Sequence, residues 1–293
     1  MFLGSVLNNP FWDLIQAGAT AAAGDLDHVD LTYSAPEEFS RANINQLIKS
    51  AIAAEPDGMA IDYRGREFEK VTLQALDLGI AVQFFNNFKA FDSSDPRVVQ
   101  LSQTAVGLDK FQAARRSAEA FSPFVTAGDP LVLFNGLPDS PEHLEIESAY
   151  IQTFTQSGWT EDQLSRFPIG LDPAQNFQAI KTYLAAHPET RGIVCWDSVT
   201  GSAAARAKAD AQLTLPVMTW NLDRTIIRSI KDGSLNLTLT QQPYLQAYYT
   251  VVGLYLKLKY GLTALPTVDP GTLIVDRSNV EQVEALFQAG VVG

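Results

Sequence analysis

The chain alternates short apolar runs with longer amphipathic stretches. Near the N-terminus the amphipathic stretches span 11–23, 39–54 and 67–78, and the apolar runs around them are LGSVL, HVDLTY, GMAID and GIAVQFF. Short apolar runs are typical of buried strands, whereas longer stretches with helical periodicity are typical of helices. This order predicts βαβ units around a parallel sheet.

The same rhythm begins again after Asp109. We expect a helix that ends near Phe121, then a strand at LVLFN, then a helix that starts at Ser140-Pro141. Further units end in the apolar runs GIVCW and LPVMTW. The fold class is therefore predicted to be α/β, with two similar lobes built of βαβ units around parallel sheets. The length of 293 residues fits two domains of about 150 residues each.

Composition and charge narrow the range of functions. The formal net charge of -12 argues against a nucleic-acid partner, because such binding depends on clustered Lys and Arg. The single cysteine, Cys195, excludes an intramolecular disulfide. The histidines His28, His143 and His187 stand in no metal-binding motif, so we expect neither a metal nor a cofactor.

The N-terminus bears on the cellular location. No apolar run reaches the ~18 residues of a membrane span, and the first residues lack the features of a signal peptide. A core strand is predicted at 2–7, directly after Met1. We therefore expect that a leader has been removed from this chain.

Polar and aromatic residues follow six of the predicted strands. In open α/β sheets, ligands bind beyond the carboxyl ends of the strands, so these residues are candidate ligand contacts. They are Asn9, Phe11, Trp12, Asp62, Arg64, Asn86, Asn87, Trp196, Trp220, Asn221 and Gln241. Amides and carboxylates exchange hydrogen bonds with hydroxyl groups, and aromatic faces pack on the C–H surface of a sugar. Each residue alone also fits a turn or a core role, but the joint pattern predicts a site for a polyhydroxylated ligand.

Seven segments, taken in order, carry a family resemblance. They are LNNPFW, NINQLIKSAIAAEPDGMAI, GIAVQFFNN, GLDKFQAARRSAEAF, GIVCWDS, LPVMTWNLD and IKDGSLNLTLTQQP. Together they resemble the type I periplasmic sugar-binding proteins of the ribose-binding kind, the solute-binding proteins of ABC transporters. Each segment is weak alone, but their order and spacing cover nearly the whole chain.

The resemblance implies a domain organisation and partners. Two Rossmann-like lobes are joined by three crossovers, and the ligand is held in the cleft between them by hinge closure. The N-terminal lobe is expected to contain residues 1–107 and 242–270, and the C-terminal lobe residues 108–241 and 271–293. The resemblance also implies a periplasmic or otherwise extracytoplasmic location. The implied partners are a small carbohydrate or polyol and the membrane permease of an ABC transporter. We expect a monomer.

Matched to the family's motifs, the candidate residues fall into two groups. The positions that keep the family's residue type are Asn9, Phe11, Trp12, Asp62, Trp220 and Gln241. Asn86 and Asn221 stand in place of aspartates, Asn87 in place of an arginine and Trp196 in place of an asparagine. The family's second arginine is expected near Ile146, where the chain has none.

These departures change the expected ligand. Two arginine donors and two aspartate acceptors are missing, and with them the charge-assisted hydrogen bonds that hold an unmodified pentose or hexose. Arg64 supplies a cation from a different strand end. We therefore predict a deoxy or otherwise modified sugar, or a polyol, rather than ribose.

Two other functions are alternatives. The same fold serves as the ligand-sensing part of transcription regulators and of chemoreceptor or sensor systems, and a helix-turn-helix or a membrane segment beside the chain would favour that function. An enzyme would need a base such as Asp62 or Asp197, but no nucleophile–base pair or metal motif stands at a recognisable spacing. We expect no enzymatic activity.

Overall fold

The computed structural model describes residues 1–86, 93–262 and 267–293, and the chain divides into two compact units. Unit 1 contains Met1–Leu108, Gln242–Gly271 and Ala289–Gly293, and unit 2 contains Asp109–Gln241 and Thr272–Gln288. Residues 289–293, assigned above to the C-terminal lobe, belong to unit 1 in this division.

Unit 1 is built on a parallel sheet whose strand order, within the described residues, is β2-β1-β3-β4-β5. Its strands are β1 (Phe2–Leu3), β2 (Tyr33–Ser34), β3 (Gly58–Ile61), β4 (Ala81–Asn86) and β5 (Val106–Gly107). Its helices are α1 (Pro10–Asp25), α2 (Arg41–Ala53), α3 (Glu69–Asp77), α4 (Pro96–Gln103) and α10 (Pro243–Tyr260). A 3-10 turn at Arg66–Phe68 precedes α3.

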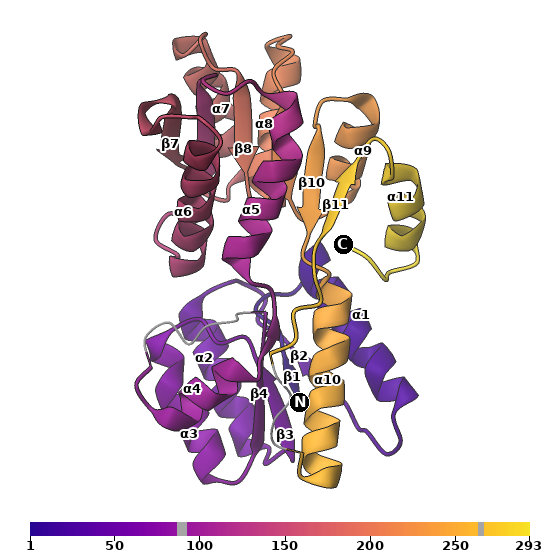
Figure 1. The fold of residues 1–293 in the computed structure, drawn as a ribbon. Coiled ribbons are helices and arrows are strands. Elements are labelled where there is room, and N and C mark those ends of the chain that lie inside the picture. Colours follow the sequence, from indigo (N-terminus) through magenta and orange to yellow (C-terminus); the bar gives the residue numbers. More distant parts are fainter. Residues whose placement is uncertain (87–92, 263–266) are drawn as a thin grey trace. The chain divides into compact units, whose positions relative to one another are not determined.

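Helices cover both faces of this sheet (Figure 1). Side chains alternate along a strand, so Phe2 and Leu3 point to opposite faces. Phe2 packs with residues of α1 and α10, and Leu3 packs with residues of α2, α3 and α4. Two apolar layers therefore hold the strand ends of unit 1 in place.

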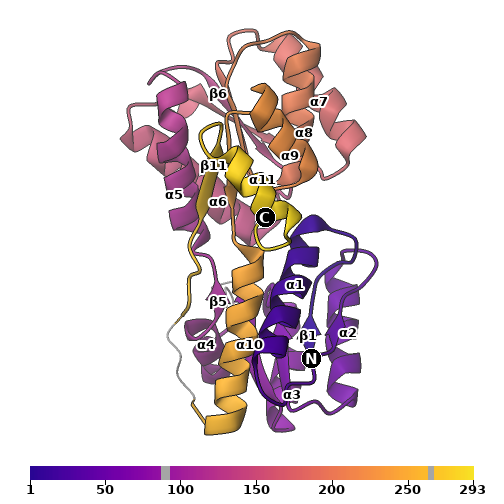
Figure 2. The ribbon, with the colours of Figure 1, turned by 90° about the vertical axis from the view of Figure 1, so that its right-hand side faces the viewer.

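Unit 2 contains a second sheet, of which Figure 2 labels β6 and β11. Within the described residues its strand order is β11-β10-β9-β8-β6-β7. Its strands are β6 (Leu131–Asn135), β7 (Leu164–Pro168), β8 (Gly192–Cys195), β9 (Val217–Trp220), β10 (Leu237–Thr240) and β11 (Leu273–Asp276). Its helices are α5 (Lys110–Phe121), α6 (Pro141–Gln156), α7 (Pro173–Ala186), α8 (Ser198–Asp210), α9 (Arg224–Asp232) and α11 (Val280–Gln288). The 3-10 turn Ser122–Phe124 follows α5, and the 3-10 turn Glu161–Gln163 precedes β7. Five strands are parallel, and β11 joins β10 antiparallel at the edge of the sheet.

Two expected boundaries differ in detail. The first strand was expected at 2–7, but β1 ends at Leu3, and the chain turns at Asn8, whose φ is 55°. Beyond the strand, Ser5 is buried and donates its hydroxyl to the Asp62 carboxylate at 2.7 Å. Ser140 and Pro141 do begin α6, although the Ser140 side chain makes no capping hydrogen bond.

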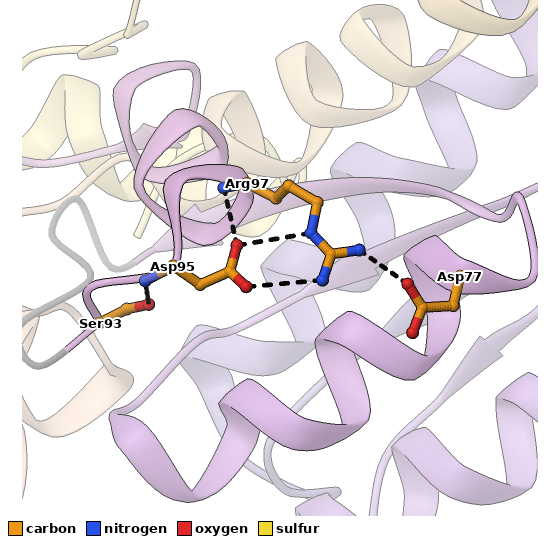
Figure 3. A network of polar contacts seen from close by, with 4 residues as sticks. All are labelled: Asp77, Ser93, Asp95 and Arg97. Carbon is orange, nitrogen blue, oxygen red and sulfur yellow. Dashed lines mark hydrogen bonds and ion pairs between the residues drawn. The ribbon is translucent and has the colours of Figure 1, made fainter.

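A polar network on the surface of unit 1 joins α3 to α4 (Figure 3). The Arg97 guanidinium donates to Asp77 on α3 at 2.7 Å and to both carboxylate oxygens of Asp95 at 3.4 Å. Asp95 is the N-cap of α4, and the hydrogen bond that it accepts from the Arg97 backbone N–H lowers the pKa of its carboxyl group. Because Arg97 and Asp77 are exposed, this network defines the start of α4 but adds little to stability.

None of the helices in the described ranges is both long and apolar enough to cross a membrane.

Candidate functional site

The carboxyl ends of β1, β3 and β4 bring the predicted residues of unit 1 to one edge. These strands are neighbours in a parallel sheet, so their carboxyl ends lie side by side. Asn9 lies in the loop after β1, Asp62 directly follows β3, and Asn86 is the last residue of β4. The edge therefore gathers side chains that are far apart in the sequence.

Asp62 is the centre of a hydrogen-bond network at this edge. The residue is buried, and its carboxylate accepts from Ser5 Oγ at 2.7 Å, from Arg64 Nε at 2.7 Å and from Asn86 Nδ2 at 3.3 Å. Because a carboxylate only accepts, the Asn86 amide faces it with nitrogen, and the amide oxygen lies on the other side. Asp62 thus orients one cation and one amide.

Arg64 is held on two sides within unit 1. Its Nη2 lies 2.6 Å from the Asp62 carboxylate, and its guanidinium carbon lies 5.0 Å from the centroid of the Phe39 ring. Its side chain is only 14% exposed, so the position is restricted. The charge of Arg64 is balanced by Asp62, and the guanidinium is a fixed donor rather than an isolated cation.

The two predicted stacking aromatics lie at the start of α1. Trp12 is buried and meets Phe11 edge to face at 5.4 Å and Phe85 of β4 at 6.0 Å between ring centroids. Phe11 is half-buried. The aromatic pair therefore continues the apolar layer of unit 1 to the edge where Asp62 lies.

Asn9 has a structural role that also orients it. It is the N-cap of α1, and its Oδ1 accepts the Phe11 backbone N–H at 3.0 Å. The amide nitrogen is consequently directed away from the helix end. Asn87, another predicted contact, lies outside the described residues.

In unit 2 the predicted residues follow β8, β9 and β10, which are also neighbours in the sheet. Trp196 follows β8, Trp220 ends β9, Asn221 comes directly after it, and Gln241 follows β10. Asn221 has φ of 68° and Asn86 has φ of 63°, so both asparagines turn the chain in the left-handed region. Asparagine tolerates this region better than most residues.

Trp196 is hydrogen-bonded to His143, which was not predicted as a site residue. Its indole N–H donates to His143 Nδ1 of α6 at 2.8 Å, so this nitrogen is an acceptor. Nearby on β6 and α6, the amide of Asn135 donates to Glu147 Oε2 at 3.0 Å. Trp196 itself is buried.

Trp220 has its polar atom inside the core of unit 2. Its indole N–H donates to the Tyr150 hydroxyl at 2.7 Å, and this hydroxyl also contacts Ser117 Oγ at 2.8 Å. Burial raises the pKa of Tyr150, which keeps the hydroxyl protonated. Only the ring of Trp220 is left as a candidate contact.

Gln241 links Asn221 to a buried lysine. Its Nε2 donates to Asn221 Oδ1 at 2.7 Å, and its Oε1 accepts from Nζ of Lys110, the first residue of α5. Lys110 is only 8% exposed. No local signal in the sequence marks it, because a lysine that opens a helix is ordinarily a surface residue.

Ser5, Phe39 and His143 were missed for a similar reason. Each contacts a predicted residue from another part of the chain, and the distance of Ser5 from Asp62 is 57 positions in the sequence. Only the folded chain makes these pairs visible.

Asp197 and Cys195 have structural surroundings. Asp197 is the N-cap of α8, and its carboxylate accepts from the backbone N–H and the hydroxyl of Thr200, each at 2.7 Å. Burial raises the pKa of this carboxyl group. A Cβ on Gly136 would lie 2.5 Å from the carboxylate, so glycine leaves the space it needs. Burial also raises the pKa of the Cys195 thiol well above its usual range, which agrees with an unreactive cysteine.

The architecture and the strand-end residues lead to a family assignment. A family model described as the periplasmic binding protein domain matches residues 1–261. The chain belongs to this family. Its members are solute-binding proteins, so the prediction of a binding protein rather than an enzyme is confirmed at the level of the family. A periplasmic location is typical of these proteins.

Individual relatives are similar over almost the whole chain. A xylose/arabinose-binding protein, XylF, of Sulfolobus acidocaldarius is 23% identical over 294 residues, which are 96% of this chain and 71% of that protein. A carbohydrate transporter structure from Acidothermus cellulolyticus 11B, in complex with myo-inositol, is 23% identical with a TM-score of 0.82, over 99% of this chain and 98% of that one. An ABC transporter solute-binding protein from Agrobacterium vitis with bound D-fucose is 18% identical with a TM-score of 0.84, over 100% of this chain and 99% of that one.

At these identities the structural likeness establishes the fold. The predicted α/β fold with two lobes of the type I periplasmic binding protein kind is confirmed. The family resemblance seen in the sequence is confirmed as well.

Proposed function

We propose that this protein captures a small sugar, a deoxy or otherwise modified sugar, or a polyol outside the cytoplasm and delivers it to the permease of an ABC importer. The observation that carries the proposal is the gathering of amides, a carboxylate and indoles at the carboxyl ends of neighbouring strands in each unit. Family membership and the sugars named for the relatives support it.

The chemistry of these side chains suits a ligand rich in hydroxyl groups. A hydroxyl both donates and accepts, and therefore needs neighbours of both kinds. Asp62 and the Asn86 oxygen are acceptors, and the amide nitrogens of Asn9 and Asn221 are donors. Trp12 and Trp196 add aromatic rings that can pack on C–H surfaces.

The balance of charge favours a ligand less polar than ribose. Asp62 and Arg64 neutralise each other, and amides occupy positions 86 and 221. Indoles contribute area rather than charge-assisted hydrogen bonds. We infer a ligand with fewer hydroxyls or with an apolar substituent; D-fucose, a deoxy sugar with a methyl group, is named for one related structure.

Isothermal titration calorimetry tests the proposal. The panel contains D-fucose, myo-inositol, D-xylose, L-arabinose, D-ribose and D-glucose. We expect D-fucose or myo-inositol to bind at least tenfold more tightly than the four unmodified sugars. Tight binding of unmodified sugars alone would refute the inferred ligand class, and no binding across the panel would refute a role in capturing sugars of this size.

A variant of Trp12 tests the placement of the site. Each aromatic contact contributes about 0.5–1.5 kcal/mol beyond area burial, so Trp12→Ala should weaken sugar binding by about that amount or more. Phe124→Ala is the matched control, because Phe124 is an exposed aromatic away from the strand ends of unit 2.

A turnover test distinguishes a transport protein from an enzyme. Chromatography of the sugar after incubation with the protein should return it unchanged, as expected of a transport protein.

We also propose that the protein acts as a monomer, which light scattering would show as the mass of one chain.

A further inference from the structure

Lys110 occupies a position that is unfavourable for a lysine. It is the first residue of α5, where the partial positive charge of the helix N-terminus repels a cation. It is also buried, with 8% of its surface exposed, and burial disfavours a charged ammonium. Helix stability therefore gives no reason for a lysine here, and the reason is to be sought in what the ammonium contacts.

The ammonium group determines the orientation of the next side chain. A lysine ammonium only donates, so the Gln241 atom that faces Nζ must be the oxygen. The Gln241 nitrogen then lies on the other side of the amide and donates to Asn221 at 2.7 Å. The atom of Asn221 that receives this hydrogen bond must be Oδ1. The chemistry of a single lysine thus defines the direction of two amides.

Asn221 is left with one unused polar group. Its backbone N–H donates to Leu239 O at 2.7 Å, and its backbone carbonyl accepts from Thr238 Oγ1 at 2.7 Å. Its Oδ1 is taken by Gln241. Across residues 1–86, 93–262 and 267–293, no atom accepts a hydrogen bond from its Nδ2. The residue is half-buried at the carboxyl edge of the sheet, so these two N–H donors remain for a ligand.

We propose that Lys110 is a positioning residue of the ligand site: through Gln241 it makes Asn221 present N–H donors, so that the ligand places an accepting oxygen there. This inference rests on the proposed function. An aspartate at position 221 would accept from a ligand hydroxyl, whereas the oriented asparagine donates to a hydroxyl, ring or ether oxygen. Lys110 thereby helps to determine which oxygen pattern is bound.

A measurement without ligand tests the orientation itself. In the wild-type protein, the Gln241 side-chain N–H protons should exchange slowly with solvent and those of Asn221 quickly, as measured by NMR on assigned side-chain amides. Lys110→Met removes the hydrogen bond that Nζ donates to Gln241 Oε1. We expect exchange of the Gln241 side-chain N–H protons to become about tenfold faster. This factor corresponds to the loss of one hydrogen bond of about 1.4 kcal/mol. Unchanged protection of Gln241 in Lys110→Met would overturn the inference.

Gln241→Glu gives an opposite and more specific result. A carboxylate only accepts, so Asn221 should turn its nitrogen toward it, and the Asn221 N–H protons should become protected. If the side chain at position 241 does not determine the orientation of Asn221, the Asn221 N–H protons would keep exchanging as in the wild type. That second outcome contradicts the proposed relay.

The ligand measurement uses whichever of D-fucose, myo-inositol, D-xylose and L-arabinose binds the wild type. Lys110→Met should weaken its affinity about tenfold, and Lys110→Arg, which still donates, should recover most of the loss. Lys208→Met is the matched control: Lys208 is a buried lysine of unit 2 as well, but its Nζ donates to the backbone oxygens of Gly233 and Ser234. The Lys208→Met variant should leave the affinity for the sugar unchanged while lowering the stability of the protein.

The two hypotheses fail in different ways. If no sugar of the panel binds the wild type, the proposed function fails, and the amide exchange still decides whether Lys110 orients Gln241 and Asn221. If a sugar binds and Lys110→Met, folded by circular dichroism, binds it as the wild type does, the positioning role is wrong and the proposed function stands.

Discussion

Each strand-end asparagine that the structure describes has one amide orientation that satisfies its neighbours. The N-terminus of α1 donates to the side-chain oxygen of Asn9, and Asp62 accepts from the side-chain nitrogen of Asn86. Gln241 donates to the side-chain oxygen of Asn221. Amide groups held in this way lose little freedom when a ligand arrives, which favours binding. At the scale of the residue, ligand selectivity thus depends on which atom of each amide is already hydrogen-bonded within its own unit.

Asp62 should be needed for the stability of unit 1 as well as for binding. Asp62→Ala leaves Arg64, Ser5 and Asn86 without their shared acceptor, and losing one partner of a buried ion pair costs roughly 3 kcal/mol. Urea unfolding measures this loss. The control is Glu67→Ala, which breaks the exposed pair with Arg41 and should cost at most about 1 kcal/mol. Equal losses for the two variants would contradict the network described for Asp62.

Asp197 should make stability depend on pH. Burial raises the pKa of its carboxyl group in the folded protein, so the folded state holds this proton more tightly than the unfolded state. The stabilisation is fully present below the unfolded value, about 3.9, and is lost as the pH rises through the folded pKa.

Asp197→Asn removes this titration and keeps a good N-cap residue. We therefore expect the stability of the wild type relative to the variant to fall as the pH rises above about 4 and through the folded pKa, measured by urea unfolding at a series of pH values. Parallel curves for the two proteins would show that Asp197 does not titrate between the two states.

At the scale of the element, the close contact of α1 and α10 determines where the first strand-end loop lies. A Cβ on Gly18 of α1 would lie 2.1 Å from the carbonyl oxygen of Tyr244 in α10. This oxygen belongs to the backbone and cannot move aside as a flexible side chain can. The glycine allows the two helices to approach, and α1 in turn places Asn9 and Trp12 at its start.

Gly18→Ala should therefore destabilise unit 1. Overpacking against a backbone atom costs about 1–3 kcal/mol, and thermal or urea unfolding would report it. Gly24→Ala, in the same helix, is the matched control: its Cβ would meet nothing within 4 Å, and alanine is the better helix former by about 1 kcal/mol. We expect opposite signs for the two variants, and a loss for both would contradict the packing argument.

At the scale of the whole molecule, each unit has its own set of proposed ligand contacts. These are Asp62 and Arg64 in unit 1, and Asn221 and Gln241 in unit 2. A ligand favours the conformation that it binds most tightly, so capture is a shift of population.

Stoichiometry and paired variants test this assignment. We expect one bound sugar per chain by calorimetry. Arg64→Ala in unit 1 and Gln241→Ala in unit 2 should each weaken sugar binding, Arg64→Ala by about tenfold or more, since hydrogen bonds to charged groups contribute about 1.5–3 kcal/mol. Arg97→Ala, which removes the exposed arginine of α4, should leave affinity unchanged. Unchanged affinity in Arg64→Ala or in Gln241→Ala would show that the residue replaced is not a ligand contact.

The amino-acid sequence by itself determined the order of strands and helices, the family and the strand ends that carry polar and aromatic residues. These features depend on periodicity and on neighbours in the chain, and in a parallel sheet the residues after neighbouring strands must meet at one edge. That is why Asn9, Asp62 and Asn86 could be expected together, although β1 proved shorter than predicted.

Only the tertiary structure decided which atom each side chain offers. The direction of Asn221 depends on Gln241 and Lys110, and these last two are 131 positions apart in the sequence. The acceptor for Trp196 is His143, 53 positions away, and the indole N–H of Trp220 is used by Tyr150. Hydrogen-bond direction depends on distances between atoms from distant segments, which no local pattern of residues contains.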